Sequence, residues 1–211
     1  MKRRFLLLMI SCLLAVGVEA QEFSVQPIPD SVFKRMQGRS WPEGCTMRLS
    51  DLRYLRLSYV DDEKKEHVGE MVCNKAIAGD LVEIFRELYR QKYPIQRIRL
   101  IDDYEADDER SMRDNNSSCF CYRKVSGTTK LSKHAQGMAV DINTLYNPYV
   151  RTGKDGHRIV EPATATKYVD RRKSFPYKIE KGDLLYRLFL QHGFKWGGSW
   201  RTMKDWQHFE K

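Results

Sequence analysis

Hydrophobic and polar residues alternate on both sides of a charged turn in the first half of the chain. Residues 53–60 (RYLRLSYV) and 67–73 (HVGEMVC) flank the charged segment DDEKKE. A period of two is typical of half-buried strands, so this region predicts a β-hairpin. After it, Asn74 is a candidate N-cap, and apolar residues then recur at helical spacing and stop before Pro94. These helical positions are Ile77, Leu81, Ile84, Phe85 and Leu88.

The second half has fewer regular patterns. Residues 95–101 (IQRIRLI) predict a strand, and two polar stretches, 102–118 and about 147–178, predict loops. A helix is predicted from Asp183 to Gly193, with Leu184, Leu185, Leu188 and Phe189 on its apolar side. The chain has no internal repeat and no regular βαβ alternation. The pattern therefore predicts an α+β fold with a small, mostly antiparallel sheet flanked by helices.

The N-terminus reads as an export signal. Lys2, Arg3 and Arg4 precede an apolar run from Phe5 to about Val18, and Val18-Glu19-Ala20 fits a signal peptidase site. The run is too short to span a bilayer, and its flanks argue against a buried N-terminal helix. We therefore expect residues 1–20 to be a cleaved signal peptide and the mature protein to be secreted or periplasmic.

The net charge of the chain excludes few classes of binding partner. The chain carries 37 Lys+Arg and 28 Asp+Glu, and removal of residues 1–20 leaves 34 minus 27, or +7. A basic excess favours anionic polymers such as nucleic acid, a membrane surface or cell wall. The basic residues are dispersed, with a longest run of Arg171-Arg172-Lys173, and no nucleic-acid motif is present. We expect no nucleic-acid partner, no transmembrane segment and a monomer.

Four cysteines remain once Cys12 leaves with the signal peptide: Cys45, Cys73, Cys119 and Cys121. An even number in an oxidising compartment favours disulfides, whose connectivity the sequence does not rank. Free thiols and a metal site are the alternatives. A single residue separates the two sulfurs of CFC, whereas structural zinc sites usually have two to four between them.

Residues 132–143 (SKHAQGMAVDIN) form the first candidate site. As a strand, this stretch puts Gly137, Ala139 and Asp141 on one face and the apolar residues Met138, Val140 and Ile142 on the other, with His134 just before it. A lone carboxylate among small residues suits a metal or a bound peptide. We expect Gly137 and Ala139 to leave room for substrate. A capping Asp and a surface His would explain this stretch if it stood alone.

The closing segment DWQHFE supplies a second imidazole, His208, and a second carboxylate, Asp205. Two imidazoles and one carboxylate form a tetrahedral zinc site with an open fourth position, which is typical of catalytic zinc. Asp205 and His208 are three residues apart and would face opposite sides of a straight strand. We therefore expect a turn or bulge between them.

These segments also carry a resemblance to a known family. SKHAQGMAVDIN is similar to the SxHxxGxAxD signature of the D-alanyl-D-alanine carboxypeptidase and L-alanyl-D-glutamate endopeptidase family of zinc peptidases (VanX/VanY type), and DWQHFE resembles its (Glu/Asp)-x-x-His element. NNSSCFCYR, NPYV and WGGSW resemble further landmarks of one subgroup. The resemblance covers roughly residues 50–211. It implies a hedgehog-like fold with the zinc site on the sheet face, and three segments: signal peptide 1–20, N-terminal extension 21–49 and zinc peptidase domain 50–211.

The resemblance also implies roles for individual residues. One zinc ion per chain is held by His134, Asp141 and His208, with Asp205 as catalytic base and Arg123 stabilising the transition state. Cys119 and Cys121 depart from the residue types expected in relatives, which leaves the conformation near Arg123 less certain. The implied activity is hydrolysis of peptidoglycan stem peptides, as a carboxypeptidase or an endopeptidase.

Two other function classes remain as alternatives. A zinc-bearing module that only binds wall fragments or a protein would not need Asp205, and a secreted nuclease would need a clustered basic stripe. Ser132 lacks an adjacent base and, with Glu210, is expected to support the site. We expect solvent-facing or structural roles for His157 and His192. Several aromatic residues are candidates for a substrate groove or for the core: Tyr146, Trp196, Trp200 and Trp206.

Overall fold

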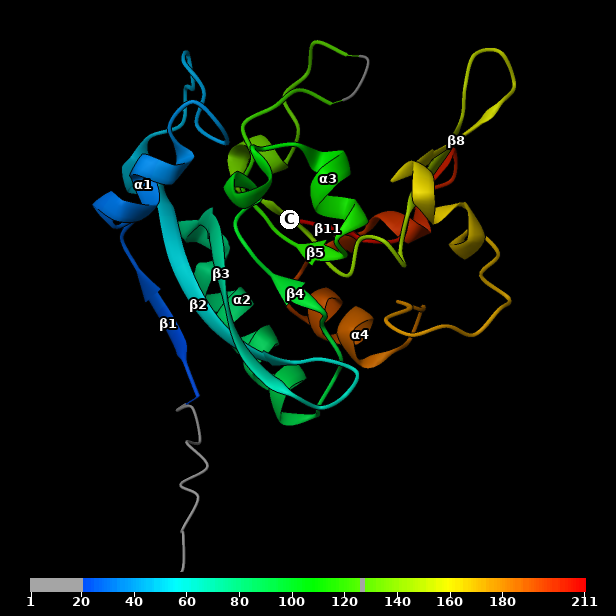
Figure 1. Cartoon of the computed structure of the whole chain (residues 1–211), viewed down its shortest axis with the longest axis horizontal. Helices are drawn as coiled ribbons and strands as arrows, with labels where there is room; N and C mark the ends of the chain where they lie inside the picture. Colours follow the sequence, from blue (N-terminus) through cyan, green and yellow to red (C-terminus); the bar gives the residue numbers. More distant parts are fainter. Residues whose placement is uncertain (1–20, 126–127) are drawn as a thin grey trace, which may run out of the picture.

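The computed structural model describes residues 21–125 and 128–211 (Figure 1). The predicted signal peptide and Cys12 lie outside these residues. Among the helices that are described, none is long and apolar enough to cross a membrane.

The N-terminal part is a three-stranded antiparallel sheet covered by one long helix. Strands β1 (Phe23–Gln26), β2 (Leu52–Val60) and β3 (Glu66–Asn74) lie in the order β1-β2-β3. β2 pairs with β3 from Leu52↔Asn74 to Val60↔Glu66, so the predicted hairpin is confirmed. Helix α2 (Lys75–Arg90) follows at once and packs against this sheet (Figure 1). The Asn74 side chain accepts a hydrogen bond from the Ala76 amide, as predicted for an N-cap.

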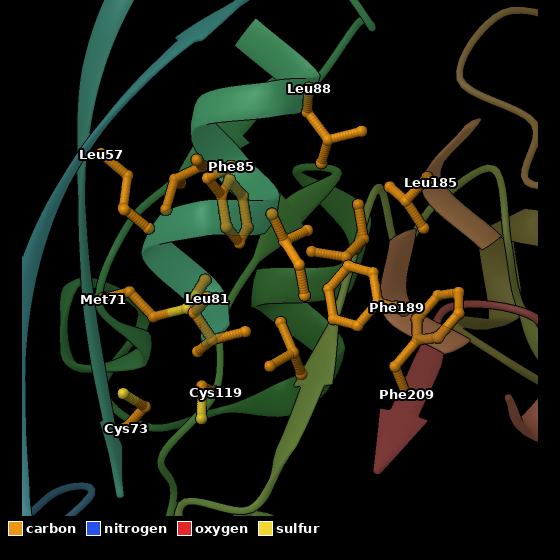
Figure 2. Packing of buried hydrophobic residues seen from close by; sticks show 14 of the residues in the cluster. Leu57, Met71, Cys73, Leu81, Phe85, Leu88, Cys119, Leu185, Phe189 and Phe209 are labelled. Atoms are coloured by element: carbon orange, nitrogen blue, oxygen red, sulfur yellow. The ribbon is translucent and has the colours of Figure 1, made fainter. Parts of the chain in front are cut away.

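The main core lies between α2 and the rest of the molecule. The apolar face of α2 meets Leu57 and Met71 of the sheet on one side and Phe189 and Phe209 of the C-terminal part on the other (Figure 2). Each fully buried side chain of this size contributes about 1.5–3 kcal/mol to folding. The buried residues of α2 include all five that its periodicity predicts: Ile77, Leu81, Ile84, Phe85 and Leu88.

A second apolar cluster covers the opposite face of the sheet. Helix α1 (Asp30–Met36) places Val32 and Met36 against Leu52, Val72 and Phe120. The 3₁₀ turn η1 (Leu49–Asp51) then leads into β2. Within residues 21–49, expected to be an extension, β1 thus joins the sheet and α1 packs in the second apolar cluster.

The C-terminal part consists of short elements. Strands β6 (Ala139–Asp141), β11 (His208–Glu210) and β9 (Lys195–Trp196) form one sheet, in the order β6-β11-β9. The predicted helix near Asp183 is present as α4 (Leu184–Gln191), which Asp183 caps and which packs beside α2. Two 3₁₀ turns flank the strands: η3 (His134–Gln136) and η5 (Gly197–Ser199).

Two predictions for the middle of the chain are wrong in part. Residues 147–178 are not all loop: β7 (Tyr149–Thr152) and β8 (Arg158–Glu161) form a hairpin that pairs with β10 (Met203–Asp205), followed by η4 (Ala163–Tyr168). Its strands carry few apolar residues, so alternation is weak. The strand predicted for residues 95–101 is shorter in the structure: only β4 (Arg97–Ile98) is present, and it runs parallel to β5 (Asn116–Ser117).

The loop predicted for residues 102–118 also contains helical structure. The 3₁₀ turn η2 (Ile101–Tyr104) precedes helix α3 (Asp108–Arg113), where the Asp107 side chain accepts from the Arg110 amide. At six residues, α3 is too short to show a hydrophobic period. With small antiparallel sheets and few helices, the molecule nevertheless has the predicted α+β fold.

Within the described residues the cysteines form no disulfide. Cys45, Cys73, Cys119 and Cys121 are all free, so the structure does not support the predicted bridges. Cys73 and Cys119 are buried in the main core (Figure 2). Burial raises the pKa of both thiols well above the usual range, so both are protonated there. Cys121 lies near Asp108 and Arg123 instead.

Candidate metal centre

His134 is fixed by the short 3₁₀ turn η3. The Ser132 hydroxyl accepts from the Ala135 amide at 3.1 Å, and Gly137 ends the turn in the left-handed region with φ of 65°. The Nδ1 atom of His134 lies 2.7 Å from the backbone oxygen of Cys119. A carbonyl oxygen only accepts, so Nδ1 carries the proton when the ring is neutral and Nε2 presents a lone pair.

Asp141 and His208 face each other across two paired strands. The register of β6 and β11 puts them directly opposite. On the far side of the His208 ring, Nε2 lies 3.3 Å from a carboxylate oxygen of Glu210. A carboxylate accepts the ring proton there and leaves Nδ1 free to act as a ligand. Glu210 and Ser132 therefore support the two histidines, as expected.

The three ligand groups converge on one point. Nε2 of His134 lies 3.2 Å from Nδ1 of His208 and 3.1 Å from Oδ2 of Asp141, and Nδ1 of His208 lies 3.0 Å from Oδ1 of Asp141. In a tetrahedral zinc site with bonds of about 2.0–2.1 Å, ligand atoms are about 3.3 Å apart. His134, Asp141 and His208 could therefore hold one metal ion.

The charges around this point favour a cation there. Burial would raise the pKa of Asp141, but His134 and His208 hold it well below its usual range. Burial would lower the pKa of His208, yet hydrogen bonds to Asp141 and Glu210 raise it to about 10. Either a proton on His208 or a metal ion supplies the positive charge. A metal needs the neutral imidazole and would displace that proton.

A cleft of about 490 Å³ opens beside the three ligands. Asp205 lies in it, at the end of β10, and the two-residue turn through Trp206 and Gln207 separates it from His208 in β11. The expected turn between Asp205 and His208 is thus present. Burial and the nearby Asp141 raise the pKa of Asp205 to about 7 against the opposing charge of His208. One of its carboxylate oxygens is buried without a hydrogen-bond partner.

Arg123 also lines the cleft, on the wall formed by the segment before His134. Its Nε atom forms an ion pair with Asp108, the first residue of α3, although the two groups are not aligned as a hydrogen bond. Burial raises the pKa of Asp108, and the Arg123 charge opposes that shift. Sequence reasoning missed Asp108, whose only signal is the acidic start of a short capped helix.

Two more residues of the cleft were missed. Tyr149 and Glu161 come from β7 and β8, inside a stretch predicted to be loop, and they pair directly across the hairpin. Burial raises the pKa of the Glu161 carboxyl. Nothing in the local sequence distinguishes them from the polar residues around them.

The expected role of Gly137 and Ala139 is wrong. A Cβ at Gly137 would lie 2.6 Å from the Asn74 backbone nitrogen, and the Asn74 amide donates to the Gly137 oxygen at 2.9 Å. Ala139 is completely buried. These small residues allow the site segment to approach the junction of β3 and α2 and do not open space above the metal.

Among the four candidate aromatic residues, only Trp200 lines the cleft, with its ring 5.3 Å from that of His208. Trp196 is buried and donates to the Trp206 carbonyl. Tyr146 packs against Tyr168 and other rings outside the cleft. The other histidines named as candidates lie elsewhere: His192 pairs with Asp80, and His157 is exposed.

Comparison with known proteins finds a family model that matches the part of the chain with this centre. Residues 126–211 match the family described as D-alanyl-D-alanine carboxypeptidase, a family of zinc peptidases. The matched part contains His134, Asp141, Asp205 and His208 and begins after Arg123. No curated protein and no solved structure matches the chain. The family indicates a peptidase that acts on peptidoglycan, and the predicted resemblance to the D-alanyl-D-alanine carboxypeptidase family is confirmed over residues 126–211.

Proposed function

We propose that this protein is an exported zinc peptidase that hydrolyses peptidoglycan stem peptides. The observation that carries the proposal is the convergence of two imidazole nitrogens and one carboxylate, 3.0–3.2 Å apart, in a cleft that also holds the buried carboxylate of Asp205. The apolar N-terminal segment and its Val-Glu-Ala site support export. Sequencing of the mature N-terminus should then begin at Gln21.

His134, Asp141 and His208 would hold the zinc ion. When bound, zinc supplies a water molecule whose pKa is lowered from 15.7 to about 7 and polarises the scissile carbonyl. The backbone oxygen of Cys119 and the carboxylate of Glu210 hold the two imidazole rings in the tautomers that the metal needs.

Asp205 is the proposed general base. Its Oδ1 atom has no hydrogen-bond partner among the described residues, so it is free to accept a proton from water in the cleft. The deprotonated water would form a C–O bond with the scissile carbonyl carbon. As the peptide C–N bond then breaks, the same carboxyl group passes its proton to the departing amine. A module that only binds wall fragments has no use for such a carboxylate.

Arg123 is proposed to stabilise the oxyanion that develops on the scissile carbonyl. Its guanidinium group lies in the cleft and is held by Asp108. A preoriented cation in a site shielded from water stabilises this charge strongly, and loss of one such contact typically lowers the rate about 10²–10³-fold. Asp108 would act through Arg123, as a positioning residue.

The cut bond is proposed to be the terminal one of the stem peptide. Lys124 and Lys130 lie exposed on the rim of the cleft, where an ammonium group would favour a terminal carboxylate. Cleavage as a carboxypeptidase releases the terminal D-alanine. Cleavage as an endopeptidase would instead release a fragment that ends at L-alanine.

Digestion of isolated stem peptides, followed by mass spectrometry, tests the proposal. The wild type should remove the terminal D-alanine, and Asp205→Asn should keep its zinc and lose nearly all turnover, because it keeps the shape but not the base. Asp155→Asn, on an exposed turn, is the matched control and should stay active. If the zinc-loaded wild type leaves every stem peptide intact and still binds wall fragments, the protein is a binding module.

A further inference from the structure

We propose that a second cleft, next to the metal cleft, binds the carboxylate groups of a neighbouring stem peptide on the same peptidoglycan polymer. We call it the basic cleft. Its volume is about 630 Å³, and five cationic residues line it: Arg151, Arg158, Arg172, Arg201 and Lys204. The choice of peptidoglycan as ligand rests on the proposed function. The presence of the cleft and its positive charge are independent of that function.

Three of these cations form no ion pair with an acidic residue in the described part of the chain, although Arg151 lies near Glu161 of the metal cleft. Arg172 forms two hydrogen bonds with Asp170, the only acidic residue of the lining, and Lys204 donates to two backbone carbonyls. Across the described parts of the chain, Arg151, Arg158 and Arg201 form no ion pair and no side-chain hydrogen bond. The three arginines that line the basic cleft therefore keep their guanidinium donors free.

The basic cleft and the metal cleft are built on the same strands. Arg151 lies opposite Met203 in the pairing of β7 with β10, and Tyr149 lies opposite Asp205 two positions along. Arg158 comes from β8, and Arg201 lies just before β10. Met203 lines both clefts, so an extended polymer can pass from one to the other across its side chain.

The form of the charge favours a polymer with several carboxylates. A guanidinium group offers a planar fork of donors that matches a carboxylate. Arg158 and Arg201 are exposed, and one exposed ion pair contributes little. Several weak contacts along one chain add up when the groups are linked, as they are in peptidoglycan, where stem peptides repeat along each strand. A second stem peptide would thus hold the polymer while the first occupies the metal cleft.

The test combines three substitutions in the full mature protein: Arg151→Gln, Arg158→Gln and Arg201→Gln. Binding to purified peptidoglycan is measured by co-sedimentation in the Asp205→Asn background, so that the polymer stays intact. We expect affinity to fall about tenfold, because three exposed ion pairs are lost together. Hydrolysis of a single short stem peptide, measured in the otherwise wild-type protein, should stay within about twofold.

A second set of three substitutions removes the same net charge elsewhere. Lys34→Gln, Arg86→Gln and Lys181→Gln all lie on exposed positions away from both clefts. This control should keep its affinity for peptidoglycan within about twofold. Equal loss in both sets would overturn the proposal, since net charge alone would then explain binding. Thermal melting checks that each variant folds, and the single change Arg201→Gln replaces the triple variant if it is unstable.

Polyphosphate, a phosphate chain without stem peptides, is the probe for the other anion chemistry. If the arginine variants weaken binding to polyphosphate but leave binding to peptidoglycan unchanged, the ligand assignment is wrong. If the wild type cuts no stem peptide and its peptidoglycan binding still depends on these arginines, the proposed function fails and the basic cleft stands. If only the control set loses affinity for peptidoglycan while the wild type cuts stem peptides, the proposal for the basic cleft is overturned and the proposed peptidase function stands.

Discussion

The two halves of the molecule are held together by different forces. In the N-terminal half, two nine-residue strands and a sixteen-residue helix bury continuous apolar faces. In the C-terminal half, no described strand is longer than four residues, and the chain turns at almost every element. The periodic segments β2, β3 and α2 form a packed unit, which we call the platform. The candidate metal site lies on short segments whose positions depend on individual polar side chains.

Asn147 illustrates how the C-terminal half is fixed. Its buried amide donates to the backbone oxygens of Asn143 and Tyr177 and accepts from the Ile179 amide and from Arg171. Arg171 in turn stacks on Trp206, next to Asp205. One side chain thus links the long segment after β6 to the turn that carries the candidate base.

The site is attached to the platform by a few backbone contacts. The Phe120 amide donates to the Val72 oxygen at 2.9 Å, and the Asn74 amide donates to the Gly137 oxygen. The first contact fixes the segment whose Cys119 carbonyl orients His134, and the second fixes the end of η3. The regular half therefore sets the position of the histidine, although it supplies no ligand.

The largest expected effect on stability comes from the platform. Phe85→Ala would leave a cavity in the main core, where Phe85 is 1% exposed, and should lower the free energy of unfolding by about 3–5 kcal/mol. Zinc content per folded chain should not change, because no ligand contacts this side chain. Urea denaturation and elemental analysis measure the two quantities, with the exposed Arg86→Gln as control. Zinc loss in folded Phe85→Ala would contradict the separation of platform and site.

A smaller loss of stability with a larger loss of function is expected in the C-terminal half. Asn147→Ala removes four hydrogen bonds, leaves the Tyr177 carbonyl and the Ile179 amide without a partner, and should cost about 2–3 kcal/mol. Turnover should fall as well, since the turn beside Asp205 loses its support. Stem-peptide hydrolysis by the folded variant is the measurement, and the exposed Thr202→Ala is the control. Unchanged turnover in Asn147→Ala would show that the polar network does not position the base.

The smallest expected effect is a pH-dependent change in stability on the α1 side of the N-terminal sheet. Burial would raise the pKa of Glu70, but hydrogen bonds from Arg35, at 3.0 Å to each oxygen, and from Tyr54 lower it below the ordinary value. A lowered folded-state pKa stabilises the protein above the ordinary glutamate pKa, and this contribution disappears as the pH falls through the folded-state value. Glu70→Gln should therefore be less stable at pH 7 by about 1 kcal/mol.

Denaturation curves of wild type and Glu70→Gln at several pH values measure this difference. The gap should close as the pH is lowered beyond the ordinary glutamate range, and zinc content should not differ at pH 7. A gap that stays constant with pH would mean that the carboxylate charge is not what stabilises this side of the sheet.

The sequence predicted what depends on neighbours along the chain. The β2–β3 hairpin, α2 and α4 follow from periodicity, helped at α2 by the N-cap at Asn74. Two motifs singled out His134, Asp141 and His208, which the fold brings together. The short strands, α3 and the roles of Asp108 and Glu161 did not follow, because they arise from contacts between distant segments. Gly137 was assigned the wrong role for the same reason: the backbone that it approaches lies 63 residues earlier, at Asn74.

Zinc content is the most direct test of the central claim, that His134, Asp141 and His208 hold one metal ion. The purified mature protein should contain one zinc per chain by elemental analysis. His134→Ala, Asp141→Ala and His208→Ala should each lose stoichiometric zinc while remaining folded, whereas Cys45→Ser and Cys121→Ser should retain it. Full zinc in all three ligand variants, or zinc that disappears with the cysteine substitutions, would contradict the account.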